Sequence, residues 1–191
     1  MNYSKKENKM GLDVIGWGCK HTYHHGYSGI HQIRTVGMKC LGLDKKLTEH
    51  QKEEILNDSR GLYTQEPTER QLSYILDVAL YGNIAFRENF NSLPLIKPLF
   101  TDEDLQPLWQ LFHFSDCEGI LIRKGFLKNV DYSQSYYLGC LDDLLENLVM
   151  IREWILHNLS RVHEQEVALI NKLYDVVNEA TNDAEGVIKF C

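Results

Sequence analysis

Apolar residues recur at intervals of three and four along two long stretches in the C-terminal half of the chain. The first stretch covers residues 138–159 and the second covers residues 162–180. The apolar positions of the first are Leu141, Leu144, Leu145, Leu148, Val149, Ile155, Leu156 and Leu159. This spacing puts apolar side chains on one face of an α-helix. It predicts two long amphipathic helices whose apolar faces form the core, the second continuing the first or packing back against it.

Four further helices are predicted, and each starts at a hydroxyl residue that can accept a hydrogen bond from the free amides of the first turn. These residues are Ser28, Thr48, Thr68 and Thr101. A capping-box partner stands three residues later in two of them, at Gln51 and Gln71, and Asp104 stands near the start of the last. The first three helices are expected to end near Leu41, Gly61 and Gly82.

Three short runs have the composition of β-strands. They are residues 11–17, 120–122 and 186–191. We expect the first and the last to pair, because the two ends of a chain often meet at the surface of a domain. Residues 1–9 are polar and are predicted to be a disordered lead-in. The sequence therefore predicts an α+β fold, a mostly helical single domain over residues 10–191 with a small β-sheet that pairs the N- and C-terminal strands.

Composition and charge narrow the classes of partner. The chain has 191 residues, a net charge of −7 and a pI of about 5.6. It has no cluster of Lys and Arg, so we expect no nucleic-acid partner. No stretch approaches the ~20 apolar residues of a membrane span, and the first residues lack the apolar core of a signal peptide. The cysteines are widely spaced without a CxxC pair, so we expect a cytoplasmic protein with no disulfide framework and no membrane contact.

Tyr27, Ser28 and Gly29 stand at the predicted start of a helix. The first amides of a helix have no intrahelical partner and lie at the positive end of its dipole, so they form a site for phosphate or carboxylate. Arg34 lies further along the same helix, where it would flank such a ligand only loosely. The simpler alternative is that Ser28 only caps the helix. The glycine spacing is not that of a P-loop.

A second candidate segment comprises Ser115, Asp116, Cys117 and Glu118, between a predicted helix and a predicted strand. Ser and Asp are common in turns, because their side chains hydrogen-bond to nearby backbone amides. Cys117 would act as a nucleophile only with a lowered pKa and a neighbouring base. Alternatively, Asp116 or Glu118 would form a carboxylate pair with Asp13, with the two pKa values split by different surroundings.

Histidines are concentrated in and beside the polar segment that precedes Ser28. They are His21, His24, His25 and His31, with Cys19 just before them. Zinc sites need three or four converging ligands, and none of the recognised zinc spacings is present. Surface histidines in a polar connection are the simpler interpretation, so we predict no bound metal and no cofactor.

Three short segments together resemble a family of small uncharacterised bacterial and phage proteins. The segments are residues 10–17, 26–34 and 114–121, in the same order as in that family. They are similar to its Met-Gly-Leu-Asp-Val start, its Tyr-Ser-Gly segment before a helix and its Phe-Ser-Asp-Cys-Glu-Gly segment. This chain departs from the pattern at Gly26, where the family has serine, and at Ile30 and His31. The family has no known activity, so the resemblance implies where a site lies and gives no chemistry.

Two classes of function remain open. The first is a non-catalytic binding or accessory module, with a polar cleft for a small anionic ligand or a partner protein. The second is a small hydrolase or transferase that uses residues 115–118 with Asp13 and a loop histidine. Asp13 is a candidate because it shares a predicted strand face with Ile15 and Trp17, where a carboxylate is unusual. We expect the first class, because no catalytic constellation is complete.

Overall fold

The computed structural model describes most of the predicted core elements and leaves several segments outside the described part of the chain. The described residues are 12–16, 22–25, 28–59, 101–113, 119–128, 138–183 and 186–190. The predicted lead-in, the helix expected from Thr68 and the candidate residues Tyr27 and 115–118 lie outside these ranges.

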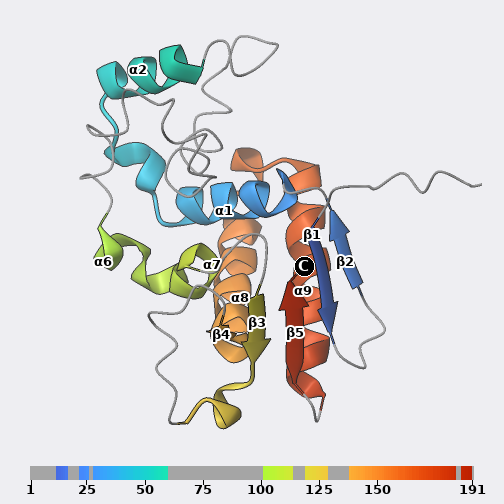
Figure 1. Ribbon diagram of the computed structural model, residues 1–191. Coiled ribbons are helices and arrows are strands. Elements are labelled where there is room, and N and C mark those ends of the chain that lie inside the picture. Colours follow the sequence, from blue (N-terminus) through green and yellow to red (C-terminus); the bar gives the residue numbers. More distant parts are fainter. Residues whose placement is uncertain are drawn as a thin grey trace, which may run out of the picture.

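A mixed sheet forms one layer of the fold (Figure 1). Its strands are β1 (Leu12–Gly16), β2 (Thr22–His25), β3 (Gly119–Ile122), β4 (Leu138–Cys140) and β5 (Val187–Phe190), in the order β2-β1-β5-β3-β4. Only β3 and β4 are parallel; the other neighbours are antiparallel. Val14 of β1 lies opposite Phe190 of β5, which confirms the predicted pairing of the first and last strands.

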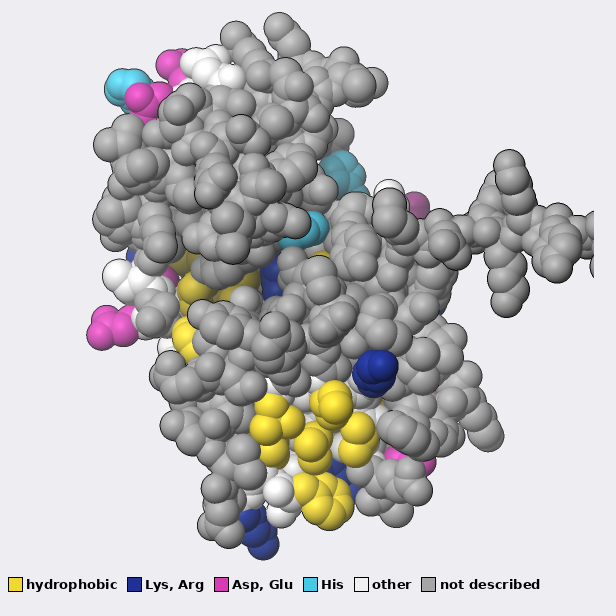
Figure 2. Space-filling model, viewed as in Figure 1, with side chains coloured by type: hydrophobic (Ala, Val, Ile, Leu, Met, Phe, Trp, Pro, Cys, Tyr) yellow, Lys and Arg dark blue, Asp and Glu magenta, His cyan; other side chains and the backbone are white. Residues whose placement is uncertain are grey.

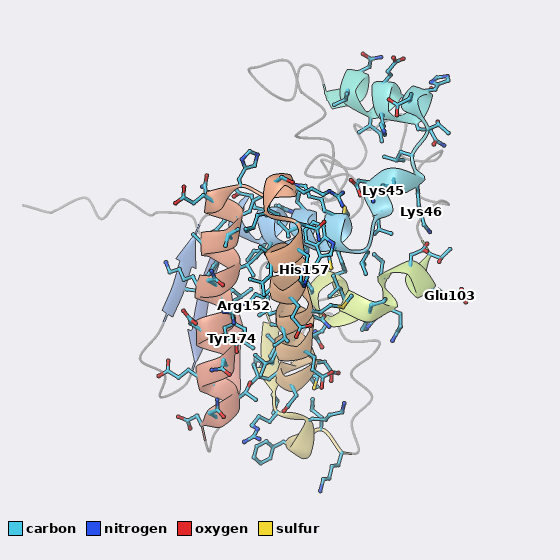
Figure 3. The ribbon with its side chains drawn as sticks, turned by 180° about the vertical axis from the view of Figure 1, so that it is seen from behind. Lys45, Lys46, Glu103, Arg152, His157 and Tyr174 are labelled. Carbon is cyan, nitrogen blue, oxygen red and sulfur yellow. The ribbon has the colours of Figure 1, made fainter. Side chains whose placement is uncertain are left out.

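The second layer is built on two long antiparallel helices. The α-helices are α1 (Ser28–Cys40), α2 (Glu49–Ser59), α6 (Asp102–Leu105), α7 (Trp109–His113), α8 (Leu141–His157) and α9 (Glu164–Asn182). Helix α9 packs back on α8, and the pair covers one face of the sheet (Figures 1 and 3). The guanidinium of Arg152 in α8 lies 3.8 Å from the ring centroid of Tyr174 in α9. These layers confirm the predicted α+β fold.

The core lies between the sheet and these helices. Tyr23, Leu121 and Ile188 point into it from β2, β3 and β5, and each is at most 1% exposed. From α8 it receives Leu141, Leu144, Leu148, Ile151 and Ile155. Burying one such aliphatic side chain stabilises the fold by about 1.5–3 kcal/mol.

The apolar face of α8 is narrower than the sequence predicted. Leu156 is 71% exposed and Leu159, just beyond the helix, is 64% exposed, whereas both were expected in the core. The buried positions follow the spacing 141, 144, 148, 151 and 155. Leu156 and Val149 lie one residue beyond this row, about 100° around the helix axis, and that rotation turns them toward solvent.

Two strands were not predicted. Residues 22–25 were expected in a polar connection, and residues 138–140 were expected to begin a helix. Strand β4 is only three residues long and contains Gly139, so it has no alternation to detect. Strand β2 pairs with β1, the strand just before it in the chain, and β4 forms by pairing with β3.

The predicted capping box at Thr48 and Gln51 is present, the one predicted at Thr68 and Gln71 lies outside the described residues, and a further box is found at Thr101. The amide of Gln51 donates to Thr48 Oγ1 at 3.3 Å, and the amide of Thr48 donates to Gln51 Oε1 at 2.9 Å. Thr101 and Asp104 make the same reciprocal pair at the start of α6. Within the described ranges, no helix has the length and apolar composition needed to cross a bilayer.

Candidate functional site

Both candidate segments adjoin the same edge of the sheet. Strands β1 and β3 run in the same direction and begin at this edge, while β2 and β5 end there. The register aligns Gly119, Phe190, Val14 and Tyr23 in one row across four strands. Helix α1 begins at Ser28, shortly after β2 ends, and Figure 1 shows its first turn beside the start of β1.

The distance along this row of four residues shows how far apart the two candidate segments join the sheet. Neighbouring strands lie about 4.8 Å apart, so Gly119 and Tyr23 are separated by roughly 14 Å across three intervals. Gly119 directly follows residues 115–118, which are themselves outside the described chain. A separation of this size is in the range of a small-molecule site.

The register also selects one histidine from the cluster. Asp13 of β1 lies directly opposite His24 of β2, whereas His25 lies opposite Leu12. In the register this pair is the direct neighbour of the Val14–Tyr23 pair, and Tyr23 is a core residue. Directly opposite positions of an antiparallel pair are close enough for their side chains to interact. The missed signal was the alternation in residues 22–25, in which the apolar Tyr23 stands between polar neighbours.

Arg34 lies inside the protein and bonds to a neighbouring helix. Its side chain projects from α1 and is 2% exposed, and its Nε donates to the carbonyl oxygen of Leu111 in α7 at 3.1 Å. The last carbonyls of a helix have no intrahelical partner, so this bond satisfies one of them. Sequence reasoning gave Arg34 only a loose place beside a ligand; the structure shows its contact with α7, the helix that precedes residues 114–118 in the chain.

Further buried contacts hold α7 in place. Gly37 of α1 packs so closely that a β-carbon there would lie 3.2 Å from the side chains of both Leu111 and Phe112. On the opposite side, Asn147 Oδ1 of α8 accepts a hydrogen bond from the Leu111 amide at 3.1 Å. Gln110 Oε1 accepts one from the Cys140 amide at 2.8 Å. Helix α7 is therefore positioned by three elements at once, although it has only five residues.

The far end of α1 is anchored as well. Lys39 Nζ donates to Glu166 Oε1 of α9 at 3.3 Å, and both side chains are at most 12% exposed. Glu166 Oε2 also accepts from the amide of His163, which completes the cap of α9. With Arg34 near its middle and Lys39 near its end, α1 is fixed along its length, and its first turn holds a defined place at the sheet edge.

The described residues offer no preformed metal site. No group of three or more His, Cys, Asp or Glu side chains among them could hold a metal ion. Cys19 and His21 lie outside the described ranges. Cys140 is buried, and partial burial raises the pKa of Cys40 to about 11, which keeps the Cys40 thiol protonated and unreactive at neutral pH.

Tyr23 of β2 is a core residue. It is 1% exposed, and burial raises the pKa of its hydroxyl well above the usual value. Lys172 Nζ of α9 lies 5.8 Å from its ring centroid. Tyr23 therefore attaches β2 to the helical layer.

Comparison with known proteins adds no relative: no protein-family model matches the chain, and no curated protein sequence or solved structure is significantly similar to it.

Proposed function

We propose that this protein is a non-catalytic binding module that holds a small anionic ligand at the sheet edge where α1 begins. The observation that supports the proposal is the register, which puts the end of β2, the start of β1 and Gly119 at one edge of the sheet; α1 begins three residues after β2 ends. Helix α1 spans 13 residues, so its first turn has amides without an intrahelical partner and a full dipole. Phosphate and carboxylate groups are the ligands that suit this position.

The proposed ligand class and cellular location follow from the composition, and the proposed place of the site is supported by the segments that resemble the bacterial and phage family. The acidic net charge of −7 disfavours a nucleic-acid ligand. The cytoplasm is the proposed location. Two of the segments that resemble the bacterial and phage family contain Ser28 and residues 115–118, and this supports the place of the site without adding an activity.

The test is anion binding measured by titration calorimetry with inorganic phosphate and with acetate. We expect the variant Ser28→Asp to bind at least about tenfold more weakly, because a fixed carboxylate in the first turn would occupy the positive end of α1. The control is Thr48→Asp, which puts the same charge at the start of α2. Equal binding by Ser28→Asp and the unchanged protein, or no binding of either anion, would contradict the proposal.

A second candidate function, a small hydrolase or transferase, is favoured by one specific observation. Asp13 lies directly opposite His24, and a carboxylate beside an imidazole can orient it as a general base. Hydrolysis of p-nitrophenyl acetate tests this function. We expect His24→Gln to abolish a rate that rises with pH around the ordinary histidine pKa of about 6.5, and His25→Gln to retain it. A rate no higher than that of free imidazole would exclude this candidate.

A further inference from the structure

Strand β3 is apolar on both of its faces, although described helices cover only one. Leu121 is fully buried against the helical layer, while Ile120 and Ile122 alternate with it and so face the other side. Ile120 is 42% exposed. A strand with one face in water normally carries polar residues there, and a strand that is apolar on both faces is typical of a sheet covered on both sides.

The neighbouring strands extend this apolar surface. Ile120 lies between Leu138 of β4 and Lys189 of β5, and Ile122 lies opposite Val187. We call the surface formed by Ile120, Ile122, Leu138 and Val187 the outer patch. Figure 2 shows hydrophobic side chains gathered over β3, β4 and β5 on the face turned away from α8 and α9. No described helix covers this face.

Basic residues flank the outer patch in a chain that is acidic as a whole. Lys189 stands beside Ile120 in the register, and the turn that follows β3 carries Lys124 and Lys128. The same turn exposes Phe126, with 65% of its side chain open to solvent. Lys124 is paired with Asp143 at 3.2 Å, whereas Lys128 and Lys189 have no acidic partner among the described ion pairs.

We propose that the outer patch docks an acidic amphipathic helix of a partner protein. A sheet face buries its apolar side chains against a helix layer, and the partner helix would supply that layer on the uncovered side. Its acidic side chains would meet Lys128 and Lys189, and this charge complementarity would set its orientation.

Two other occupants fit the surface less well. A second copy packed about a two-fold axis through the outer patch would bring Lys189 and Lys128 close to their own equivalents, and like charges at an interface disfavour that arrangement. An anionic bilayer would satisfy the lysines, but Ile122, Leu138 and Val187 are half-buried on a flat sheet and do not protrude into it. A helix that brings its own apolar ridge matches half-buried positions better.

The experiment uses two synthetic helical peptides with the same leucine positions, one with glutamate and one with lysine at every other site. Fluorescence anisotropy with the full-length protein measures both affinities at low and high salt. We expect the glutamate peptide to bind at least tenfold more tightly than the lysine peptide, and salt to weaken it. Ile120→Glu should reduce the affinity for the glutamate peptide about thirtyfold, and Lys128→Glu about three- to tenfold.

The matched control is Leu156→Glu, which adds the same charge to an exposed leucine of α8, and it should leave peptide binding unchanged. Lys128→Glu keeps the test decisive if Ile120→Glu fails to fold. Equal binding of the two peptides, no binding of the glutamate peptide, or equal losses in Leu156→Glu and Ile120→Glu would overturn the proposal. It would also be overturned if phosphatidylserine vesicles bind and the peptide does not, or if sedimentation shows a dimer that Ile120→Glu dissociates.

Discussion

At the scale of single residues, Arg34 is a charged side chain buried where α1 packs against α7. Moving a guanidinium out of water is unfavourable unless its donors are bonded, and Nε is bonded to the carbonyl of Leu111. The bond joins the helix that begins at Ser28 to the helix that leads into residues 114–118. Arg34 therefore links α1 to α7, the two helices that adjoin the candidate segments in the chain.

Replacing Arg34 with methionine keeps much of the side-chain volume and removes the donor. The Leu111 carbonyl then loses this bond, and we expect the free energy of unfolding to fall by about 1–3 kcal/mol. Urea denaturation followed by circular dichroism measures the change. The control, Lys45→Met at an exposed position, should stay within about 0.5 kcal/mol of the unchanged protein. An equally small effect of Arg34→Met would show that the bond does not fix α7.

Asp104 gives a prediction about pH. The hydrogen bond from Lys46 and the amide of Thr101 lower the pKa of Asp104 from 3.8 to about 2. Figure 3 shows Lys46 on the side of its 3-10 helix that faces α6. Because the pKa is lower in the folded state, Asp104 stabilises the fold above its ordinary pKa, and that contribution is lost as the pH falls through about 2.

Carbon-detected NMR of the Asp104 carboxyl group measures this pKa directly. We expect a midpoint near 2 in the unchanged protein and a higher midpoint in Lys46→Met, because the largest cause of the shift is removed. Lys45→Met changes the neighbouring lysine, which has no such bond, and should leave the midpoint where it is. Identical midpoints in all three proteins would mean that Lys46 and Asp104 do not pair in solution.

At the scale of elements, the connection into β5 depends on one glycine. Gly186 has a φ of +51°, and a β-carbon there would lie 2.2 Å from Cδ of Arg123. Its carbonyl accepts a hydrogen bond from the Arg123 amide at 3.2 Å. The segments around Arg123 and Gly186 approach closely at this point, next to the Ile122–Val187 pair of β3 and β5.

Gly186→Ala should lower the free energy of unfolding by about 1–3 kcal/mol, since a left-handed conformation alone disfavours alanine by roughly 1–2 kcal/mol. Chemical denaturation provides the measurement. Gly125→Ala is the matched control, because that glycine has no atom near its missing β-carbon and its φ is not positive. If the two variants lose the same stability, the conformation of Gly186 is not what limits the substitution.

The elements that could be predicted from the sequence are those stabilised by interactions between residues close together in the chain. The starts of α2 and α6 were predictable because a capping box is complete within four residues, as at Thr48 and Thr101. Strands β2 and β4 were not, because they have only four and three residues and are stabilised by pairing with β1 and β3. The exposure of Leu156 was missed because periodicity identifies the apolar face of a helix but not how much of that face the neighbouring elements cover.

On the scale of the whole molecule, β5 is the central strand and joins the β1–β2 hairpin to the β3–β4 pair. Ile188→Ala removes a fully buried side chain from this strand, and we expect a loss of about 2–5 kcal/mol in the free energy of unfolding. Lys189→Ala, the next residue on the solvent-facing side, should stay within about 0.5 kcal/mol. Thermal denaturation of both variants tests this, and a similar loss in each would contradict the central place of Ile188.

The candidate site shows the same division between local and non-local information. Sequence reasoning found Ser28, Asp13 and residues 115–118 as separate segments, because each has an unusual local composition. It did not find that Asp13 lies opposite His24, because that requires β2 and its register. Nor did it find that Arg34 bonds to Leu111, a contact between residues far apart in the chain.

The central position of β5 has a consequence for synthesis in the cell. Val14 pairs with Phe190, so the inner edge of the β1–β2 hairpin stays open until nearly all of the chain between them has been made. At about 5–20 residues per second, this wait lasts roughly 10 to 35 seconds. An open strand edge invites pairing with other chains during that time. The inner edge of the newly made hairpin is therefore exposed to such pairing until β5 has been synthesised.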